Sequence, residues 1–354
     1  MNGLTEYGNY IVRFMEKIKI NHLDLFSGIG GFHLGFERAG FEVNSYFSEI
    51  DKYAIQVYKH KFKNSNYVGS VTDVRGGDLP KIDIITFGSP CQDFSLAGKR
   101  KGLRGERSSL IGEAIRLIRE TRPRVFIWEN VKGTFSSNNR QDFTAILQAF
   151  ANIGGYRLEW QLLNTKWFLP QNRERVYLVG YLGDGSGGEI FPIGQSFRKD
   201  DNEISLFGDT NKGGQKVIIY NTEGIVGSLT ATDYKQPKQI KVNSATSRGY
   251  EVAKEGDTIN YSVPNSKTRR GRVGKGVAQT LDTACNQAVV HSPSIRRLTP
   301  VECERLQGFP DNWTKEGSEG MISDTQRYKM CGNAVTVDVV EAVANNIRKL
   351  VYAK

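Results

Sequence analysis

One of the four cysteines is placed where a thiol could act as a nucleophile. Cys91 lies in the segment GSPCQDFS (88–95), which directly follows the apolar run Ile82–Phe87. If that run is a central strand, Pro90 stiffens the turn after it and the thiol is presented at the strand's end, where a thiolate would be a good nucleophile. The other cysteines lack this setting, and we expect them to be small buried hydrophobic residues: Cys285, Cys303 and Cys331.

A carboxylate follows a second apolar run. Glu129 comes directly after Val125–Trp128. If this run and Ile82–Phe87 are strands of one parallel sheet, Glu129 and Cys91 lie on the same rim, where the carboxyl ends of the strands meet. A carboxyl group there could hydrogen-bond a heterocycle nitrogen or give it a proton. Taken alone, Glu129 is better explained as a cap of the segment that follows.

A glycine turn follows a third apolar run. The segment LDLFSGIGG (23–31) predicts a strand, a tight turn and the start of a helix, whose free N–H groups can bind a ligand. The dinucleotide fingerprint G-x-G-x-x-G is absent, because its last position is His33. An acid at the end of the next run, Glu49, could accept ribose hydroxyls. Together these features favour an adenosyl ligand without a pyrophosphate, such as S-adenosylmethionine.

Alternating strands and helices are expected to position these residues. The predicted strands are His22–Phe26, Val43–Phe47, Ile82–Phe87, Val125–Trp128, Arg157–Leu163 and Arg175–Val179. The predicted helices are Gly31–Ala39, Asp51–Lys61, Ser108–Thr121 and Gln141–Ile153. This alternation predicts an α/β fold with a doubly wound, mostly parallel, Rossmann-like sheet. Ligands of such sheets bind beyond the carboxyl ends of the strands, which here are followed by the loops 27–31, 48–51, 88–108 and 129–135.

The charge of the chain points to a polyanionic partner. Its 354 residues include 48 Lys and Arg against 38 Asp and Glu, a net charge of +10. The length suggests two domains or one domain with an insertion. The longest apolar runs have the length of strands and the N-terminus lacks a signal pattern, so we expect neither a membrane span nor export. The scattered cysteines argue against a zinc site and for a reducing cytoplasm.

Two segments concentrate the positive charge. The loop Gly98–Arg107 holds five basic residues and one acid, and it could close over a polyanionic substrate. The acid-free stretch between Asp257 and Asp282 holds Lys267, Arg269, Arg270, Arg272 and Lys275. Each segment is explained either as a solvated loop or as a surface that contacts phosphates.

Six sequence blocks, taken together and in this order, resemble the DNA (cytosine-5) methyltransferase family of bacterial and phage restriction-modification type. They are DLFSGIGGF (24–32), GSPCQDFS (88–95), ENV (129–131), QNRERVYLVG (171–180), RRLTPVECERLQGFP (296–310) and CGNAVTVDVV (331–340). The resemblance covers most of the chain outside the Gly-rich, basic middle. It implies methylation of cytosine C5 within a specific duplex DNA sequence. The implied cofactor is S-adenosylmethionine, which becomes S-adenosylhomocysteine, and no metal is implied.

The resemblance also implies roles for individual residues. Cys91 would attack C6 of a cytosine flipped out of the duplex, and Glu129 would hold and protonate N3. Arg173 and Arg175 would hold the base O2 and support the nearby backbone and Glu129. The cofactor site would be lined by Phe26, Ser27, Gly28, Gly30, Gly31, Glu49, Ile50, Ser70, Val71, Pro90, Asn333 and Val335. DNA would be contacted by Ser95, Lys99, Arg100, Arg104, Arg107, Lys267, Arg269, Arg270 and Arg272.

A domain organisation follows from the same blocks. Gly183–Gly188 predicts a linker into a smaller, irregular β-rich part with short strand-like pieces at 216–220 and 288–290, and a last amphipathic helix is predicted over Val335–Tyr352. The predicted parts are an N-terminal extension (1–19), a catalytic domain (20–184), a target-recognition domain (185–327) and a C-terminal segment that returns to the catalytic domain (328–354). We expect a cytoplasmic, nucleoid-associated monomer that binds double-stranded DNA and no membrane. A cognate restriction endonuclease, if present, would act independently, and the methylation would protect DNA from it.

This chain departs from the family at two positions. Members usually contact the adenine with Gly-Asp-Ile/Val-Thr, where this chain has Gly-Ser-Val-Thr (69–72). Ser70 can still form a hydrogen bond, and Asp73 could substitute for the missing acid. Ile50 stands where many members carry an aromatic residue that stacks on the adenine, so it would supply apolar packing only.

Three other functions remain as alternatives. A tRNA cytosine-5 methyltransferase of the same fold would have a short middle domain, whereas this one is long. A non-catalytic DNA-binding relative would lack Cys91 or Glu129, and both are present. A nicotinamide-dependent oxidoreductase is disfavoured by His33 in the fingerprint.

Overall fold

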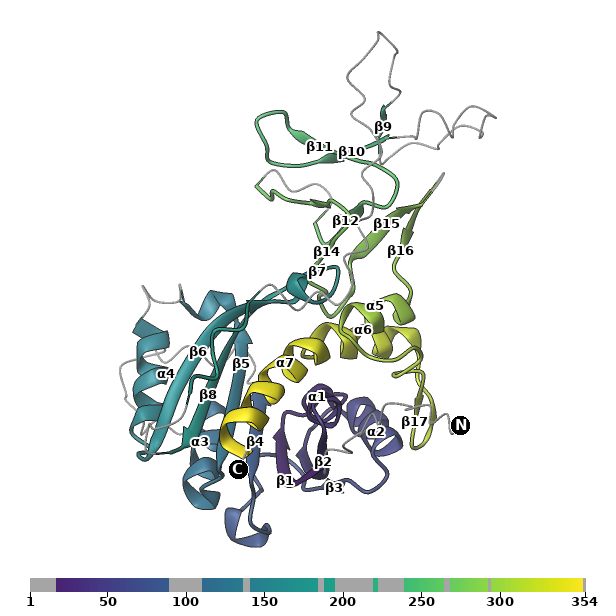
Figure 1. Ribbon diagram of the computed structural model, residues 1–354. Helices are drawn as coiled ribbons and strands as arrows, with labels where there is room; N and C mark the ends of the chain where they lie inside the picture. Colours follow the sequence, from purple (N-terminus) through teal and green to yellow (C-terminus); the bar gives the residue numbers. More distant parts are fainter. Residues whose placement is uncertain are drawn as a thin grey trace, which may run out of the picture.

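A seven-stranded sheet forms the centre of the larger part of the molecule (Figure 1). The computed structural model describes residues 17–88, 110–135, 141–183, 188–194, 219–221, 239–263, 268–291 and 294–352. In spatial order the strands are β3 (Asn66–Tyr67), β2 (Phe41–Ser48), β1 (Ile18–Leu25), β4 (Ile84–Gly88), β5 (Val125–Val131), β8 (Glu174–Leu182) and β6 (Tyr156–Asn164). Within this sheet β8 runs opposite to the other six strands. The prediction of a mostly parallel α/β sheet is confirmed.

Helices cover both faces of the sheet. They are α1 (Gly31–Arg38), α2 (Lys52–Lys61), α3 (Leu110–Thr121), α4 (Gln141–Ala151) and α7 (Val337–Ile347). Successive strand side chains point to opposite faces, so each strand contributes to two cores. Leu23 and Phe87 belong to the core under α3 and α4, whereas Ile20 and Ile84 belong to the core under α1 and α7. The sheet is therefore doubly wound, and the C-terminal helix α7 packs beside α1.

The predicted elements of the first half all have counterparts in the structure, with ends that differ by a few residues. The last predicted helix is interrupted, because α7 ends at Ile347 and a π-helical turn, Arg348–Tyr352, follows it. Every helix among the described residues is too short or too polar to cross a membrane.

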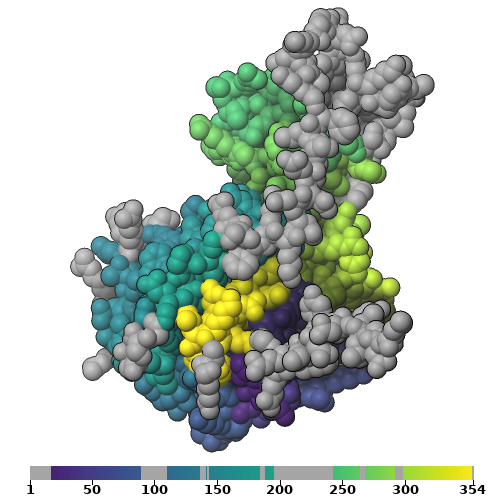
Figure 2. Space-filling model, in the orientation of Figure 1, coloured from purple at the N-terminus to yellow at the C-terminus, as the bar shows by residue number. Residues whose placement is uncertain are grey.

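Two small sheets form a second lobe, which stands beyond the carboxyl ends of the central strands (Figures 1 and 2). The first contains β9 (Ile219–Asn221), β10 (Gln239–Asn243) and β11 (Tyr250–Ala253), and the second contains β12 (Thr258–Asn260), β13 (Val273–Gly274), β15 (Gln287–His291) and β16 (Ser294–Arg297). The described residues of this lobe share one small apolar core: Val242, Ala253, Ile259, Val273 and Val290. The strand-like pieces expected near 216–220 and 288–290 correspond to β9 and β15, with residues 216–218 outside the described ranges.

The two lobes are joined by backbone pairing around Gln171. Strand β7 (Gln171–Asn172) pairs in parallel with β14 (Ala278–Gln279). The buried Gln171 side chain donates to the carbonyl of Leu306 at 2.7 Å and accepts from the N–H of Leu281 at 3.1 Å. The elements between this junction and α7 are α5 (Pro300–Leu306), β17 (Glu316–Gly317), β18 (Gly320–Met321) and α6 (Asp324–Asn333).

Candidate active site

Glu129 lies near the carboxyl end of β5, between the last residue of β4 and the neighbouring strand β8. In the register of the sheet it pairs with Gly88 of β4 and with Tyr177 of β8. The residue is 8% exposed, and the Nε of Arg175 lies 3.1 Å from its Oε1. Its Oε2 faces Gly88, where an added Cβ would come within 3.0 Å of it. The buried carboxylate therefore stands beside the last residue of β4, three positions before Cys91 in the chain.

The two arginines of the QNRERVY block reach different partners. Arg175 approaches Glu129, and its Nη1 donates to the carbonyl of Glu174 at 2.8 Å. Arg173 is buried, and its Nη2 donates to the carbonyl of Ala334 at 2.8 Å. Arg175 thus orients the carboxylate, whereas Arg173 ties the start of β8 to the segment that leads into α7.

The predicted glycine turn is present, and its backbone enters the left-handed region at three residues. Phe26, Gly28 and Gly30 have φ angles of 53°, 52° and 83°, in the left-handed region that glycine tolerates best. Gly31, the first residue of α1, lies against the returning C-terminal segment, since an added Cβ would be 2.6 Å from Val335 Cγ2. The turn and the segment before α7 therefore meet at the carboxyl end of β1.

Glu49 is held at this turn by backbone N–H groups. Its Oε2 accepts from Gly28 at 2.8 Å, and its Oε1 accepts from Ile50 at 2.7 Å and from Asp51 at 2.9 Å. A carboxylate offers about four acceptor positions, so one position at Oε2 is left for a hydroxyl of a ligand. The geometry fits the ribose of an adenosyl cofactor.

Other residues near the turn fit the same group. The Oγ of Ser27 is buried, and the described residues supply no hydrogen bond to it. Ile50 is 80% exposed, which places a large apolar side chain in the open next to Glu49. Val71 is buried, and the Oγ of Ser70 lies 2.9 Å from Thr72 Oγ1. Asn333 is exposed at the end of α6.

A polar network lies beneath the turn and was not anticipated from the sequence. Asp24 accepts from Thr86 Oγ1 at 2.9 Å and from the hydroxyl of Tyr58 at 3.3 Å, and His22 Nε2 lies 2.7 Å from the same Thr86 oxygen. All four residues are fully buried. Burial raises the pKa of Asp24 well above its usual value. The network connects β1, β4 and α2 directly behind the turn.

An ion pair joins α2 to α6 near the same site. Asp51 caps α2 by accepting from the N–H groups of Tyr53 and Ala54, and Lys329 Nζ lies 2.6 Å from its other oxygen. Burial alone would raise the pKa of Asp51, but the Lys329 ammonium and the two N–H groups outweigh it and hold the pKa below its usual value. The loop that carries Glu49 is thereby fixed to the C-terminal segment.

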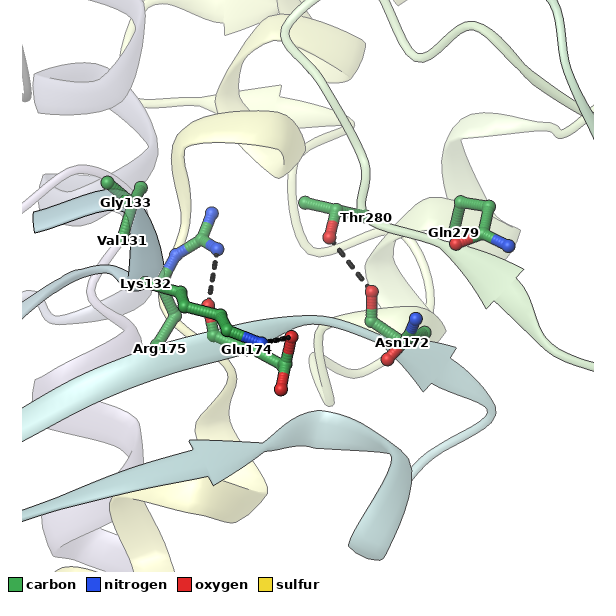
Figure 3. Close-up of a pocket in the computed structure, with 8 residues that line it drawn as sticks. All are labelled: Val131, Lys132, Gly133, Asn172, Glu174, Arg175, Gln279 and Thr280. Atoms are coloured by element: carbon green, nitrogen blue, oxygen red, sulfur yellow. Dashed lines mark hydrogen bonds and ion pairs between the residues drawn. The ribbon is translucent and has the colours of Figure 1, made fainter. Parts of the chain in front are cut away.

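A polar cavity of about 290 Å³ opens between Glu129's end of the sheet and the second lobe (Figure 3). It is lined by Val131, Lys132, Gly133, Asn172, Glu174, Arg175, Gln279 and Thr280. Lys132 Nζ lies 2.8 Å from Glu174 Oε2, and Thr280 Oγ1 donates to the carbonyl of Asn172 at 2.8 Å. The pairing of β5 with β8 and that of β7 with β14 bring these residues together, and apart from Arg175 none of them was predicted as a site residue.

The arginines of the second lobe fall into two groups. Arg269 and Arg270 are exposed and bond to Ser262 Oγ and to the carbonyl of Ala245, respectively. Arg272 is 5% exposed, and its guanidinium donates to the carbonyls of Asn243 and Asn260. The Arg272 donors therefore serve the interior of the lobe, and its contact with DNA stays a prediction. Arg248, which the sequence analysis overlooked, is also exposed.

Several predicted site residues lie outside the described ranges: Pro90, Cys91, Ser95, Lys99, Arg100, Arg104, Arg107 and Lys267. The three cysteines that were expected to be structural are buried. Two of them, Cys303 and Cys331, share a cluster with Cys285 at the junction of the lobes, and their thiols have raised pKa values. In the described part of the chain no three or more His, Cys, Asp or Glu side chains are grouped so as to hold a metal ion.

The sequence is similar to that of known methyltransferases over most of its length. The profile of the family described as C-5 cytosine-specific DNA methylase matches residues 20–349. The type II methyltransferase M.Bsp6I of Bacillus sp. (strain RFL6) is 31% identical over 336 residues, covering 92% of this chain and 97% of that protein. The type II methyltransferase M.NlaX of Neisseria lactamica is 32% identical over 336 residues, covering 94% and 97%.

A solved structure shows the same fold. The Dnmt2 methyltransferase of S. pombe superposes with a TM-score of 0.57, covering 93% of this chain and 98% of that one. Its sequence is 18% identical, so the likeness concerns the fold alone.

Proposed function

The chain belongs to the C-5 cytosine-specific DNA methylase family, and from that premise we propose which residues carry out the reaction. It is a DNA cytosine-5 methyltransferase. C5 of cytosine is a poor nucleophile, so the reaction needs a group that adds to C6, an acid at N3 and a methyl donor, all on one side of the base. We propose that the rim formed by the ends of β1, β4 and β5 supplies them to a cytosine flipped out of the duplex.

Cys91 is the proposed nucleophile. A chain of three residues extends at most about 11 Å, which keeps Cys91 within reach of the Gly88–Glu129 pair. Its thiolate adds to C6 while Glu129 gives a proton to N3, and the electron pair of the 5,6-bond then becomes available at C5 to take the methyl group. Loss of the C5 proton to a base or water, departure of the thiolate and return of the N3 proton to Glu129 restore the base and the enzyme. Arg175, 3.1 Å from Glu129, holds the carboxyl group in place and is the arginine proposed to reach O2.

The proposed methyl donor is S-adenosylmethionine, whose sulfonium makes its methyl group electrophilic. Oε2 of Glu49 would accept a hydrogen bond from a ribose hydroxyl at the acceptor position that its backbone partners leave open. Ile50 would cover the adenine. The rest of the cofactor would be enclosed by the turn 26–31 and by Ser70, Val71, Asn333 and Val335. Asp73 is exposed, and its carboxylate accepts a hydrogen bond from Thr72 Oγ1, the same hydroxyl that Ser70 contacts.

We further propose that the second lobe reads the DNA sequence and that methylation protects DNA in a restriction-modification system. Support for the protective role comes from the relatives, which are type II methyltransferases. Exposed Arg269 and Arg270 are the proposed phosphate contacts of the lobe, and base edges would be read in the major groove.

The observation that carries the proposal is the buried Glu129 beside Gly88, with Arg175 against it. Its test is Cys91→Ser, assayed for transfer of labelled methyl groups to unmethylated duplex DNA and, separately, for DNA binding. Methyl transfer should be abolished while DNA binding is largely retained, because a serine hydroxyl stays protonated near neutral pH. Cys303→Ala, at a buried cysteine, is the matched control and should keep its turnover per folded molecule. Turnover retained by Cys91→Ser would identify another nucleophile.

A further inference from the structure

The cavity between the lobes holds a cation that the proposed reaction leaves without a role. Lys132 follows Glu129 by three residues and lines the cavity with its neighbour Arg175 (Figure 3). Arg175 is engaged, since its Nε faces Glu129 and its Nη1 donates to a backbone carbonyl. The Lys132 ammonium is 57% exposed and contacts one carboxylate, that of Glu174, at 2.8 Å.

The ion pair between Lys132 and Glu174 is weak enough for another anion to replace Glu174. Glu174 is itself 37% exposed, and an ion pair open to water is weak and screened by salt. Lysine carries its charge on a flexible stem with three rotatable donors, so it can turn from one anion to another without moving the backbone. The opposite wall of the cavity, Gln279 and Thr280, belongs to the second lobe and adds no charge.

We propose that Lys132 binds a backbone phosphate of the target DNA strand next to the extruded cytosine, and that Glu174 holds Lys132 in the absence of DNA. The inference rests on the proposed function, because it places the DNA strand between Glu129 and the second lobe. A cavity of about 290 Å³ has room for a phosphate and part of its sugar, whereas the base would lie deeper, at Glu129. Glu174 then competes with the phosphate for Lys132. Lys132 therefore promotes the productive binding of DNA, whereas Glu174 opposes it.

The test compares charge-neutralising variants by kcat/KM for unmethylated plasmid DNA with labelled S-adenosylmethionine, over about 50 to 200 mM salt. Lys132→Gln should lower kcat/KM about fourfold at 0.2 M salt and reduce the slope of its logarithm against log salt by about 0.9, the contribution of one phosphate. Glu174→Gln should raise kcat/KM, because it releases Lys132. The double variant should match Lys132→Gln, and Lys132→Arg should keep the wild-type slope.

The matched control is Lys19→Gln, which breaks the exposed Lys19–Glu42 pair at the opposite ends of the strands and should change neither value. If Lys132→Gln and Glu174→Gln lower kcat/KM alike, the pair is structural and the inference is wrong. The inference is also wrong if the wild type methylates DNA and Lys132→Gln has the same slope of log kcat/KM against log salt as the wild type. A wild type that transfers no methyl group to DNA would instead overturn the proposed function itself.

Discussion

The Glu129 carboxylate meets an arginine with one oxygen and a glycine with the other, and these neighbours have different effects. Arg175 orients the side chain from β8, and Gly88 leaves the space in front of it open. A group fixed in this way needs no reorganisation when a base arrives, which is how positioned polar groups lower a barrier. In the proposed reaction, the cytosine would meet this carboxyl group from the β4 side.

Glu129→Gln tests this role. An amide can hydrogen-bond N3 but cannot give it a proton, so we expect kcat to fall by about 10²- to 10⁴-fold, the usual contribution of a positioned acid. KM for DNA should change much less. Steady-state kinetics with Glu42→Gln as the control, an exposed carboxylate at the far ends of the strands, would measure this. A variant that loses DNA affinity but keeps kcat would show Glu129 to be a binding residue only.

At this scale the sequence predicted part of the site. Glu49 and Glu129 are recognisable because each stands at or close to the end of a predicted strand, and strand ends meet at one rim. Arg272 could not be distinguished from Arg269 and Arg270, since its burial depends on carbonyls of two strands that the sequence does not reveal. Lys132 and Glu174 are 42 positions apart, and only the antiparallel pairing of β5 with β8 makes them neighbours.

The elements around the cofactor turn are held by side chains at their ends. Asp51 caps α2 and binds Lys329 of α6, and the loop between β2 and α2 carries Glu49. The first-half elements were predictable because strongly apolar strands alternate with amphipathic helices. Of the second lobe, only the β-rich character and two strands, β9 and β15, were predicted, because its strands are two to five residues long and show no periodicity.

The Asp51–Lys329 pair predicts a pH dependence of stability. The pKa of Asp51 is lower in the folded protein than in the unfolded chain, so its contribution is present above the unfolded value, about 3.9. That contribution is lost as the pH falls through the lowered folded value. Asp51→Asn keeps the helix cap but removes the charge.

Urea unfolding measures this contribution. At pH 7, Asp51→Asn should be less stable than the wild type by at most about 1 kcal/mol, because the Lys329 side chain is 47% exposed. The difference should shrink below about pH 4, where Asp51 of the unfolded chain begins to protonate, and it should vanish once Asp51 of the folded protein is also protonated. Lys329→Met should show the same loss at pH 7. A difference that is constant from pH 7 to the acid limit would contradict this role of the ion pair.

In the part of the chain that the structure describes, the rim at the carboxyl ends of the central strands faces a small β lobe, and the two are joined through Gln171. The buried amide of Gln171 bonds to Leu281 on one side and to Leu306 on the other, so the lobe is fixed in orientation to the rim. The net charge of +10, which first suggested a polyanion, is in part located by the structure. Arg269 and Arg270 carry some of it on the surface of the lobe, and Lys132 carries some of it in the cavity.

The salt dependence of DNA binding tests this arrangement. Replacing Arg269 and Arg270 together by Gln should reduce the slope of log K against log salt by about 1.8, that is, 0.9 for each phosphate that is no longer neutralised. Arg272→Gln should instead lower the melting temperature of the protein, because the carbonyls of Asn243 and Asn260 lose their buried donor. Fluorescence anisotropy and thermal unfolding measure the two effects. An unchanged slope in the double variant would mean that Arg269 and Arg270 face solvent in the complex.

The identity of the methylated product tests the central claim most directly. Purified protein would be incubated with methyl-labelled S-adenosylmethionine and either unmethylated duplex DNA or bulk tRNA, and each nucleic acid would then be digested to nucleosides and separated. We predict that the label is found in 5-methyl-deoxycytidine from DNA, and that Cys91→Ser gives no label. Bisulfite sequencing of the treated DNA should show protected cytosines at one repeated sequence. Label confined to tRNA, or found on adenine or on the exocyclic nitrogen of cytosine, would contradict the account.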